Sequence, residues 1–405
     1  MAFRVRVVRD LGEFRAALGS IGHYLGWAPS EEEAERFARL LPLERMHAVL
    51  EDGRIVAAAG VLPFELTVPG GRVPCAGVTV VGVLPSHRRR GLLRRLMEAQ
   101  LAEMQARSEP VAALWASEET IYGRFGYGLA SLNLLLQAER RAGLRATLPP
   151  REGRVRLVGH EEALALLPRL YERVRRVTPG FLSRSRDWWE LRILDDRPER
   201  RRGAGPLNRA VVELDGRPAG YALYRIAQDG SGLDWRKTVR VVEALGVDAR
   251  ATREAWRFLF EIDWTDRLEY WHLPVDHPLL LLSGRLNLLR GTVADALWVR
   301  LVDVPAALAA RAGRAAGRAT IEVVSDPLVP ANVGVWTVEA GAVRRARRRP
   351  DVRLSVQALG SAYLGGFSVH ELAAAELAEE GARGGLARAD ALLRSTVAPW
   401  CPEIF

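Results

Sequence analysis

Alternating apolar and polar residues, interrupted by short glycine-containing turns, dominate the first part of the chain. This pattern predicts strands at 46–50, 54–62, 65–68, 76–83 and 111–115. Glu51-Asp-Gly53 is a hairpin turn sequence, and Pro69-Gly-Gly71 predicts a second turn. Apolar residues then recur at helical spacing and predict a helix over 92–107. The order is therefore a meander of strands, a helix and a further strand.

Much of this order recurs about 160 residues later along the chain. Strands are predicted at 209–214, 219–226 and 238–247, and a helix at 253–262. Asp215-Gly-Arg-Pro218 takes the place of the hairpin turn, and Asp248 opens the segment before the helix. We interpret the recurrence as a duplicated fold.

The remaining residues predict a smaller α+β unit. Its predicted strands are 318–324, 334–339, 342–347 and 353–355, and its predicted helices are 304–311, 356–364 and 368–376. The first boundary is expected where Pro149-Pro150 interrupts a polar stretch, and the second near Arg290-Gly291. A length of 405 residues suits more than one domain, and we assign them to 1–142, 143–290 and 291–405.

The segment from Val78 to Leu93 carries the strongest chemical indication. An apolar run ends at Pro85, an arginine-rich turn follows, and a long amphipathic helix begins at about Gly91. Free backbone N–H groups and the positive end of the helix dipole converge at such a turn, which suits it to hold a diphosphate. The alternative is an arginine-rich helix start on a solvated surface.

The spacing Arg88-x-x-Gly91 resembles the acyl-CoA-binding motif of the GNAT acetyltransferase superfamily, although Leu93 replaces its last small residue. Together with Ile121-Tyr-Gly-Arg-Phe-Gly-Tyr-Gly128 and an aromatic C-terminus, it resembles the Eis family of N-acetyltransferases along the whole chain. The resemblance implies two tandem GNAT-like domains, each a mixed sheet flanked by helices, followed by a sterol-carrier-like α+β domain. It also implies acetyl-CoA as cosubstrate and assembly into a homo-hexamer.

The same resemblance assigns the cofactor contacts. Arg88 and Arg89 fall at the phosphates, where Gly91 and Leu92 begin the helix. The remaining implied contacts are the backbone groups of Val81 and Val83 along the pantetheine arm, and Ser117 beside the cofactor. In the second copy Asp248 stands at the diphosphate position, and its charge would repel the cofactor. We therefore expect only the first domain to bind acetyl-CoA.

Acetyl transfer to an amine needs a group that removes a proton from the ammonium and a group that protonates the departing thiolate. The resemblance places the acid at Tyr122, whereas Tyr127 is expected to pack in the glycine-rich turn. His87 belongs to the phosphate turn and is not nominated as the base. The family uses the C-terminal carboxylate, here that of Phe405, and the apolar, proline-stiffened segment before it favours burial. Glu403 or a water molecule is the alternative base.

The acceptor is weakly specified by the sequence. Acidic candidates are the glutamates of 31–35, Glu118, Glu119 and Glu403. Phe37, on what we take as the first helix, is expected to form an aromatic wall. Aminoglycosides, protein lysine side chains and other primary amines are the acceptors considered, with direct transfer in a ternary complex.

The net charge of +9 raises the alternative of a nucleic-acid-binding regulator. Lys237 is the only lysine, and the arginines are scattered beside glutamates except at 344–349, so we favour compositional bias and expect no nucleic-acid partner. Two cysteines without metal-ligand spacing predict no metal site and a reducing, cytoplasmic setting. No apolar run reaches the ~18 residues of a membrane span. A non-catalytic acyl-CoA-binding or lipid-binding protein is the remaining alternative.

Overall fold

The computed structural model describes residues 3–229, 236–312 and 317–405. The chain forms two compact units. The first comprises Met1–Ser131, Ala296–Pro399 and Glu403–Phe405, and the second comprises Leu132–Asp295 and Trp400–Pro402. No helix in the described ranges has both the length and the apolar character needed to cross a bilayer.

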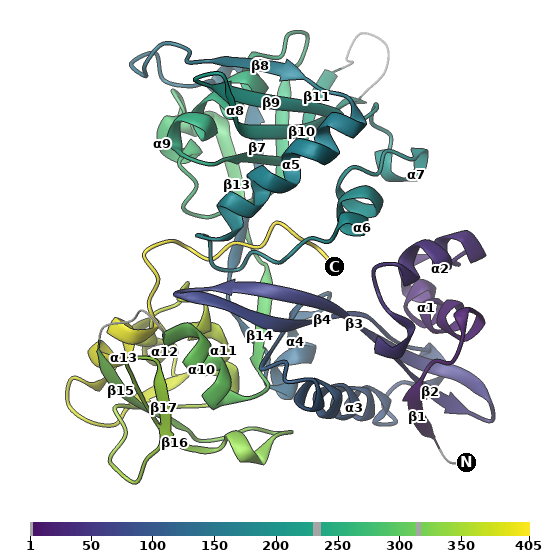
Figure 1. Ribbon diagram of the computed structural model, residues 1–405, viewed down its shortest axis with the longest axis vertical. Helices are drawn as coiled ribbons and strands as arrows, with labels where there is room; N and C mark the ends of the chain where they lie inside the picture. The colour runs from purple at the N-terminus through teal and green to yellow at the C-terminus, as the bar shows by residue number, and fades with distance from the viewer. Residues whose placement is uncertain (1–2, 230–235, 313–316) are drawn as a thin grey trace. The chain divides into compact units, whose positions relative to one another are not determined.

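A mixed seven-stranded sheet forms the centre of the first unit (Figure 1). In spatial order its strands are β1 (Arg4–Val7), β2 (Met46–Glu51), β3 (Arg54–Val68), β4 (Gly71–Val83), β5 (Val111–Trp115), β14 (Leu297–Leu301) and β6 (Gly128–Leu129). Among the described strands of this sheet, only β4 and β5 run parallel to each other. The predicted break in β3 at Pro63 is wrong, because Pro63 lies opposite Ala76 within a continuous ladder.

Helices α1 (Leu11–Leu25), α2 (Glu31–Ala38), α3 (Leu92–Ala106) and α4 (Glu119–Tyr122) accompany this sheet, with short 3₁₀ turns η1 (Leu43–Arg45), η2 (Pro85–His87) and η3 (Gly123–Phe125). The apolar stripe of α3, including Leu96, Met97 and Leu101, is buried against the sheet. Phe37 therefore lies on the second helix, because α1 precedes it. Asp10 accepts from the Glu13 N–H at 2.9 Å and begins α1.

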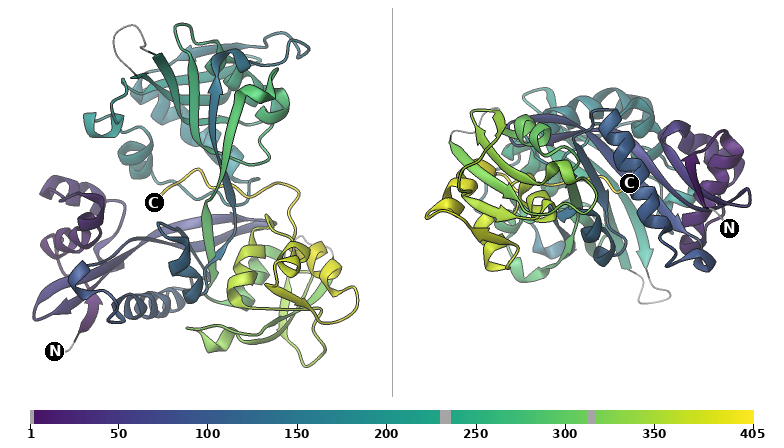
Figure 2. Two further views of the ribbon diagram at one scale, coloured as in Figure 1. Left: turned by 180° about the vertical axis from the view of Figure 1, so that it is seen from behind. Right: turned by 90° about the horizontal axis from the view of Figure 1, so that it is seen from below.

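The first unit also contains a five-stranded sheet with its own helices. The strands are β17 (Ala342–Arg345), β16 (Gly334–Glu339), β15 (Arg318–Val323), β18 (Val352–Leu354) and β19 (Ala378–Glu380) in spatial order. The helices are α10 (Val304–Ala312), α11 (Val356–Tyr363), α12 (Val369–Ala374) and α13 (Gly385–Leu393), and η8 spans Pro330–Asn332. Helix α11 packs against β14 and β6 of the larger sheet (Figure 2).

The second unit repeats the topology of the first large sheet, which confirms the predicted duplication. Its strands are β8 (Arg154–Leu157), β9 (Asn208–Leu214), β10 (Arg217–Asp229), β11 (Arg236–Gly246), β12 (Arg267–Leu273), β7 (Leu132–Glu139) and β13 (Leu289–Asp295) in spatial order. Here β11 and β12 are the parallel pair. The accompanying helices are α5 (His160–Arg175), α6 (Arg186–Trp188), α7 (Pro198–Arg201), α8 (Ala249–Glu261) and α9 (Leu279–Leu282), with turns η4 (Arg140–Ala142), η5 (Trp189–Ile193) and η7 (Leu286–Leu288).

Two strands lie in a different sheet from the one that the sequence division suggests. Strand β7 lies within the predicted first domain, 1–142, but pairs with β12 and β13 of the second unit. Strand β14, expected to open the third domain, pairs with β5 and β6. Each strand satisfies the backbone groups that β12 or β5 would otherwise leave unpaired at a sheet edge. No strand is predicted at β7 from the sequence, and β14 is not placed in the sheet of the first domain.

Candidate active site

The turn between β4 and α3 leaves the N-terminus of a long helix open. Arg89 and Gly91 adopt left-handed backbone angles, with φ of 61° and 77°. Gly91 is the N-cap of α3, and no side chain caps the first-turn N–H groups. Uncapped N–H groups and the helix dipole together favour an anion at this point. The turn that the sequence singled out thus has the geometry of an anion-binding site.

The arginines of this turn divide into two kinds. Arg90 donates to Glu51 at 3.1 Å and stacks 4.4 Å from the centre of the Phe3 ring. By contrast, the guanidinium groups of Arg88 and Arg89 are exposed and have no hydrogen bond or ion pair among the residues that the structure describes. The Arg90 side chain therefore makes contacts within the fold, whereas the side chains of Arg88 and Arg89 are available to contact a ligand.

His87 also contacts Glu51, with 2.7 Å between Nε2 and the carboxylate oxygen. Together with the charge of Arg90, this hydrogen bond holds the pKa of Glu51 below its ordinary value. The ring of His87 therefore anchors the turn to β2.

Strands β4 and β5 separate after a short paired stretch. The two strands pair only from Cys75–Gly77 to Val111–Ala113, although β4 continues to Val83. A register irregularity with β3 lies in this continuation, where Val80 has φ of 46°. Val81 and Val83 are half-buried beyond the point of separation, and Tyr24 of α1 donates to the Val83 carbonyl at 2.6 Å. The separation leaves one edge of β4 open to an extended ligand.

Tyr122 and Tyr127 lie at the end of β5 in the turn that leads to β6. Tyr122 is 6% exposed, and its hydroxyl group makes no hydrogen bond within the described chain. Burial, and then the charge of Glu118, raise the pKa of Tyr122 to about 12. Tyr127 is more deeply buried, with its ring centre 6.1 Å from that of Tyr122. Ser117, which precedes Tyr122 on the same connection, is exposed.

The aromatic C-terminus lies where β4 and β5 part. The Phe405 ring packs edge-on against Phe64, with 5.2 Å between ring centres. A Cβ atom on Gly77 would lie 3.2 Å from the Phe405 ring, and Gly77 is the last residue of β4 that pairs with β5. Glu403 is buried, at 3% exposure. The tail predicted to be buried is therefore held at the open edge of β4.

Phe37 is half-buried on α2, and its ring centre lies 6.2 Å from that of Phe14 on α1. Sequence reasoning missed α1 and with it Tyr24. The Asp10 cap and Gly26, which ends the helix with φ of 62°, were the available signals.

The corresponding helix of the second unit is closed. Asp248 accepts from the Ala251 N–H at 2.8 Å and begins α8 at Ala249, four residues earlier than predicted. Its carboxylate occupies the place that an anionic ligand would take, and it adds a negative charge there.

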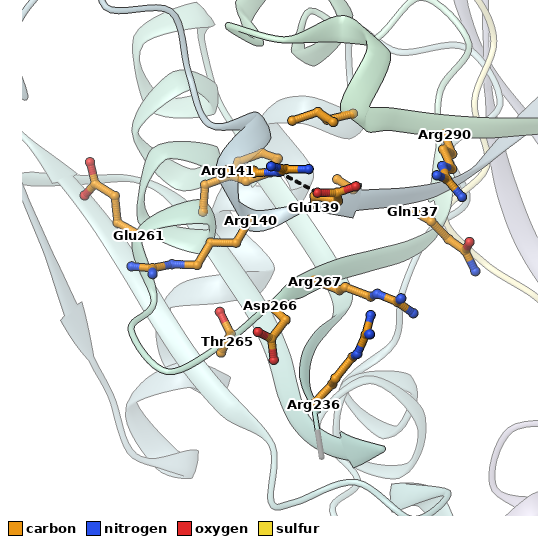
Figure 3. Close-up of a pocket in the computed structure, with 13 residues that line it drawn as sticks. Gln137, Glu139, Arg140, Arg141, Arg236, Glu261, Thr265, Asp266, Arg267 and Arg290 are labelled. Carbon is orange, nitrogen blue, oxygen red and sulfur yellow. Dashed lines mark hydrogen bonds and ion pairs between the residues drawn. The ribbon is translucent and has the colours of Figure 1, made fainter. Parts of the chain in front are cut away.

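The second unit contains a cavity of about 700 Å³ away from α8's N-terminus, beside its C-terminal residues Phe260 and Glu261 (Figure 3). Its lining includes Arg140 and Arg141, which pair at 2.7 Å with Asp263 and Glu139. None of the predicted site residues lines this cavity.

Comparison with known proteins identifies the class of protein. Residues 11–130 and 180–301 each match an acetyltransferase (GNAT) domain, and residues 304–402 match a sterol carrier protein domain. The chain is thus an acetyltransferase with two GNAT domains and a sterol-carrier-like domain, and GNAT domains use an acyl-CoA cosubstrate.

The similarity extends over the whole chain. An uncharacterized N-acetyltransferase of Streptomyces avermitilis is 38% identical over 94% of both chains. N-acetyltransferase Eis of Mycobacterium tuberculosis is 35% identical over 95% of this chain and 94% of its own. The crystal structure of Eis1 from Mycobacterium abscessus superposes with a TM-score of 0.86 at 33% identity, covering 99% of this chain and all of the other. The chain belongs to the Eis family of N-acetyltransferases.

Proposed function

We propose that this enzyme transfers the acetyl group of acetyl-CoA directly to a primary amine in a ternary complex. One observation carries the proposal: the uncapped start of α3, with two unpaired arginines, follows strand β4. The open edge of β4 has its other end beside the chain's C-terminus. Arg88, Arg89 and the N–H groups that begin at Gly91 and Leu92 then bind the phosphates. The backbone of Val81 and Val83 binds the pantetheine arm, and Ser117 lies beside it.

Tyr122 is the proposed acid. The amine attacks the thioester carbonyl carbon, and the tetrahedral intermediate then expels the thiolate of CoA, whose pKa is about 8.5. A phenol held protonated by burial donates its proton to this sulfur. The raised pKa keeps the Tyr122 hydroxyl protonated at every pH near neutrality, so a donor to the departing sulfur is present in each turnover.

The carboxylate of Phe405 is the proposed base. A free α-carboxylate is a weak base, with a pKa of about 3.5, so it acts directly after burial raises its pKa or through a relaying water. Glu403, which is buried in the same tail, is the alternative. Glu403 and Phe37 are the proposed contacts of the acceptor, for which we consider aminoglycosides and protein lysines. We also propose a cytoplasmic homo-hexamer, as the family resemblance implies.

A non-catalytic lipid carrier is the less favoured function. In the sterol-carrier-like domain the buried guanidinium of Arg311 donates to the carbonyl groups of Tyr363, Leu392 and Leu393. Burial lowers the pKa of Arg311 to about 10. A guanidinium bound to three carbonyls at this position favours a structural interior over an apolar ligand site.

A thiol-release assay tests the proposal. Purified enzyme is mixed with acetyl-CoA and a panel of polyamines, aminoglycosides and lysine peptides, and free CoA is measured. We expect amine-dependent CoA release together with the acetylated amine by mass spectrometry. Acetyl-CoA binding without release for any amine would instead support the carrier function.

A further inference from the structure

Three glycines in the turn that carries Tyr122 lie directly against other elements. We call this turn the Tyr122 loop, residues 119–129. A Cβ atom on Gly123 would lie 2.8 Å from Nε2 of Gln357, and one on Gly126 would lie 2.7 Å from Nη1 of Arg300. At Gly126, with φ of 86°, the backbone therefore approaches Arg300 more closely than a residue with a side chain allows, whereas at Gly123 only the flexible Gln357 side chain would have to move.

Gly128 makes the tightest of these approaches. Its Cβ atom would lie 2.6 Å from the Ser361 nitrogen and would also overlap the Gln357 carbonyl oxygen. Both are backbone atoms of α11, so neither can rotate away. The glycines of the motif Tyr-Gly-Arg-Phe-Gly-Tyr-Gly thus fit the loop onto α11 and β14.

Arg300 of β14 is held rigidly beneath the loop. Its Nη2 group donates to Oδ1 of Asp326 at 2.7 Å, and both side chains are fully buried. Asp326 also accepts from the Leu328 and Val329 N–H groups at 3.0 and 2.9 Å. The other guanidinium nitrogens, Nε and Nη1, have no hydrogen-bond partner in the described residues, and Nη1 faces Gly126. The group therefore acts as a fixed surface rather than as a donor to the loop.

Helix α11 is fixed with equal firmness. Ser355 caps its start by accepting from the Ala358 N–H at 3.1 Å. Gly360 allows the helix to lie directly against the Val299 carbonyl of β14. The platform under the Tyr122 loop is consequently built by β14 together with a helix of the sterol-carrier-like domain.

We propose that this platform positions the Tyr122 hydroxyl for proton transfer to the thiolate, with Gln357 and Arg300 as positioning residues. Helix α11 of the sterol-carrier-like domain then contributes to catalysis through the Tyr122 loop, separately from the C-terminal tail and without touching the substrates. The inference rests on the proposed function, because it assumes that the Tyr122 hydroxyl is the acid. Displacement of a reacting group by ~1 Å commonly lowers a rate by ~10²-fold.

The first test is Gly128→Ala, with Gly19→Ala as the matched control. Gly19 lies in α1, and a Cβ atom there has nothing within 4 Å. We expect Gly128→Ala to lower kcat by roughly 10- to 100-fold and to leave the Kd for acetyl-CoA within about twofold. Gly19→Ala should keep both values. An unchanged kcat, or an equal loss of acetyl-CoA affinity, would overturn the proposal.

A second pair of variants covers the case in which Gly128→Ala does not fold. Gly123 lies in a region of the backbone that alanine accepts, so Gly123→Ala meets only the flexible Gln357 side chain. Gly123→Ala should lower kcat several-fold, and adding Gln357→Ala should restore part of it by removing the overlap. A double variant no faster than Gly123→Ala would contradict the contact.

Hydrogen exchange separates this inference from the proposed function. Mass spectrometry of peptides covering 119–129 reports how firmly the loop is held, whether or not the enzyme turns over the amine supplied. We expect faster exchange in Gly123→Ala and slower exchange again in the double variant. Unchanged exchange in Gly123→Ala would refute the platform, whereas an inactive wild-type enzyme with the expected exchange pattern would refute only the proposed function.

Discussion

The division of the arginine run into two kinds gives a sharp prediction about cofactor binding. Arg88→Ala and Arg89→Ala each remove an exposed guanidinium group that has no partner in the described protein. Neither change strands a carboxylate, so we expect the thermal unfolding midpoint to stay unchanged. Each change removes a charge-assisted phosphate contact worth about 1.5–3 kcal/mol, which corresponds to about 10- to 150-fold in Kd.

Arg90→Ala is the matched control at the next position. It removes a surface ion pair with Glu51, worth about 0–1 kcal/mol, and a cation–π contact with Phe3, worth about 0.5–1 kcal/mol. We therefore expect up to about 2 kcal/mol of lost stability and a much smaller change in affinity. Stability and affinity should thus respond to different arginines of one run.

Isothermal titration calorimetry with acetyl-CoA and thermal unfolding of the three variants measure both quantities. The affinity of the wild-type enzyme should also fall as salt is added, because exposed charges are screened within about 10 Å at 0.1 M ionic strength. The reasoning fails if Arg90→Ala loses as much affinity as Arg88→Ala, or if both Arg88→Ala and Arg89→Ala bind acetyl-CoA as the wild type does.

Four further predictions concern the acid, the base and the assembly. Tyr122→Phe should slow turnover by roughly 10²- to 10⁴-fold with little change in acetyl-CoA affinity, whereas Tyr127→Phe should have only a small effect on turnover. Equal steady-state rates for the two variants would show that Tyr122 is not the acid. Because the pKa of Tyr122 is raised to about 12, deprotonation of Tyr122 should cause no fall in kcat/KM below about pH 10. A fall in kcat/KM below this pH that is present in the wild type and absent in Tyr122→Phe would contradict the prediction. Residues added after Phe405, or deletion of Phe405, should abolish turnover while Phe405→Leu retains much of it; a C-terminally tagged enzyme of normal rate would return the base to Glu403 or water. Sedimentation at micromolar concentration should show a homo-hexamer, and a clean monomer would exclude it.

The parts of the site that lie close together in the sequence were predictable, because local rules set them. The helix start after Arg88-x-x-Gly91 follows from turn chemistry and periodicity, and the structure places α3 at Leu92 as predicted. Asp248 was expected to repel an anionic cofactor by its charge, but its role as the N-cap, which moves the helix start to Ala249, was missed. Such features depend on a few consecutive residues, so the sequence contains nearly all the information needed.

The parts that depend on distant partners were not predictable. Nothing in the apolar pattern of β14 indicates that it joins the sheet of the first domain rather than the third domain, because its partners β5 and β6 lie far away in the sequence. The role of Glu51 in holding His87 and Arg90 is likewise invisible from the sequence, since 36 residues separate it from His87. The three glycines of the Tyr122 loop indicated a tight turn, but only the structure identifies Gln357, Arg300 and Ser361 as what they approach.

The duplicated sheet separates what the fold requires from what the chemistry requires. Strands β11 and β12 also stop pairing partway, after Val241 and Tyr270, and β11 also has a register irregularity with β10. The separation of the parallel strands is therefore a property of the fold. Beyond it, however, the second unit buries Glu243 and pairs it at 3.0 Å with Arg184. A buried ion pair lies beyond the separated strands, and an aspartate caps the helix N-terminus. We therefore expect the second domain to keep the architecture without binding acetyl-CoA.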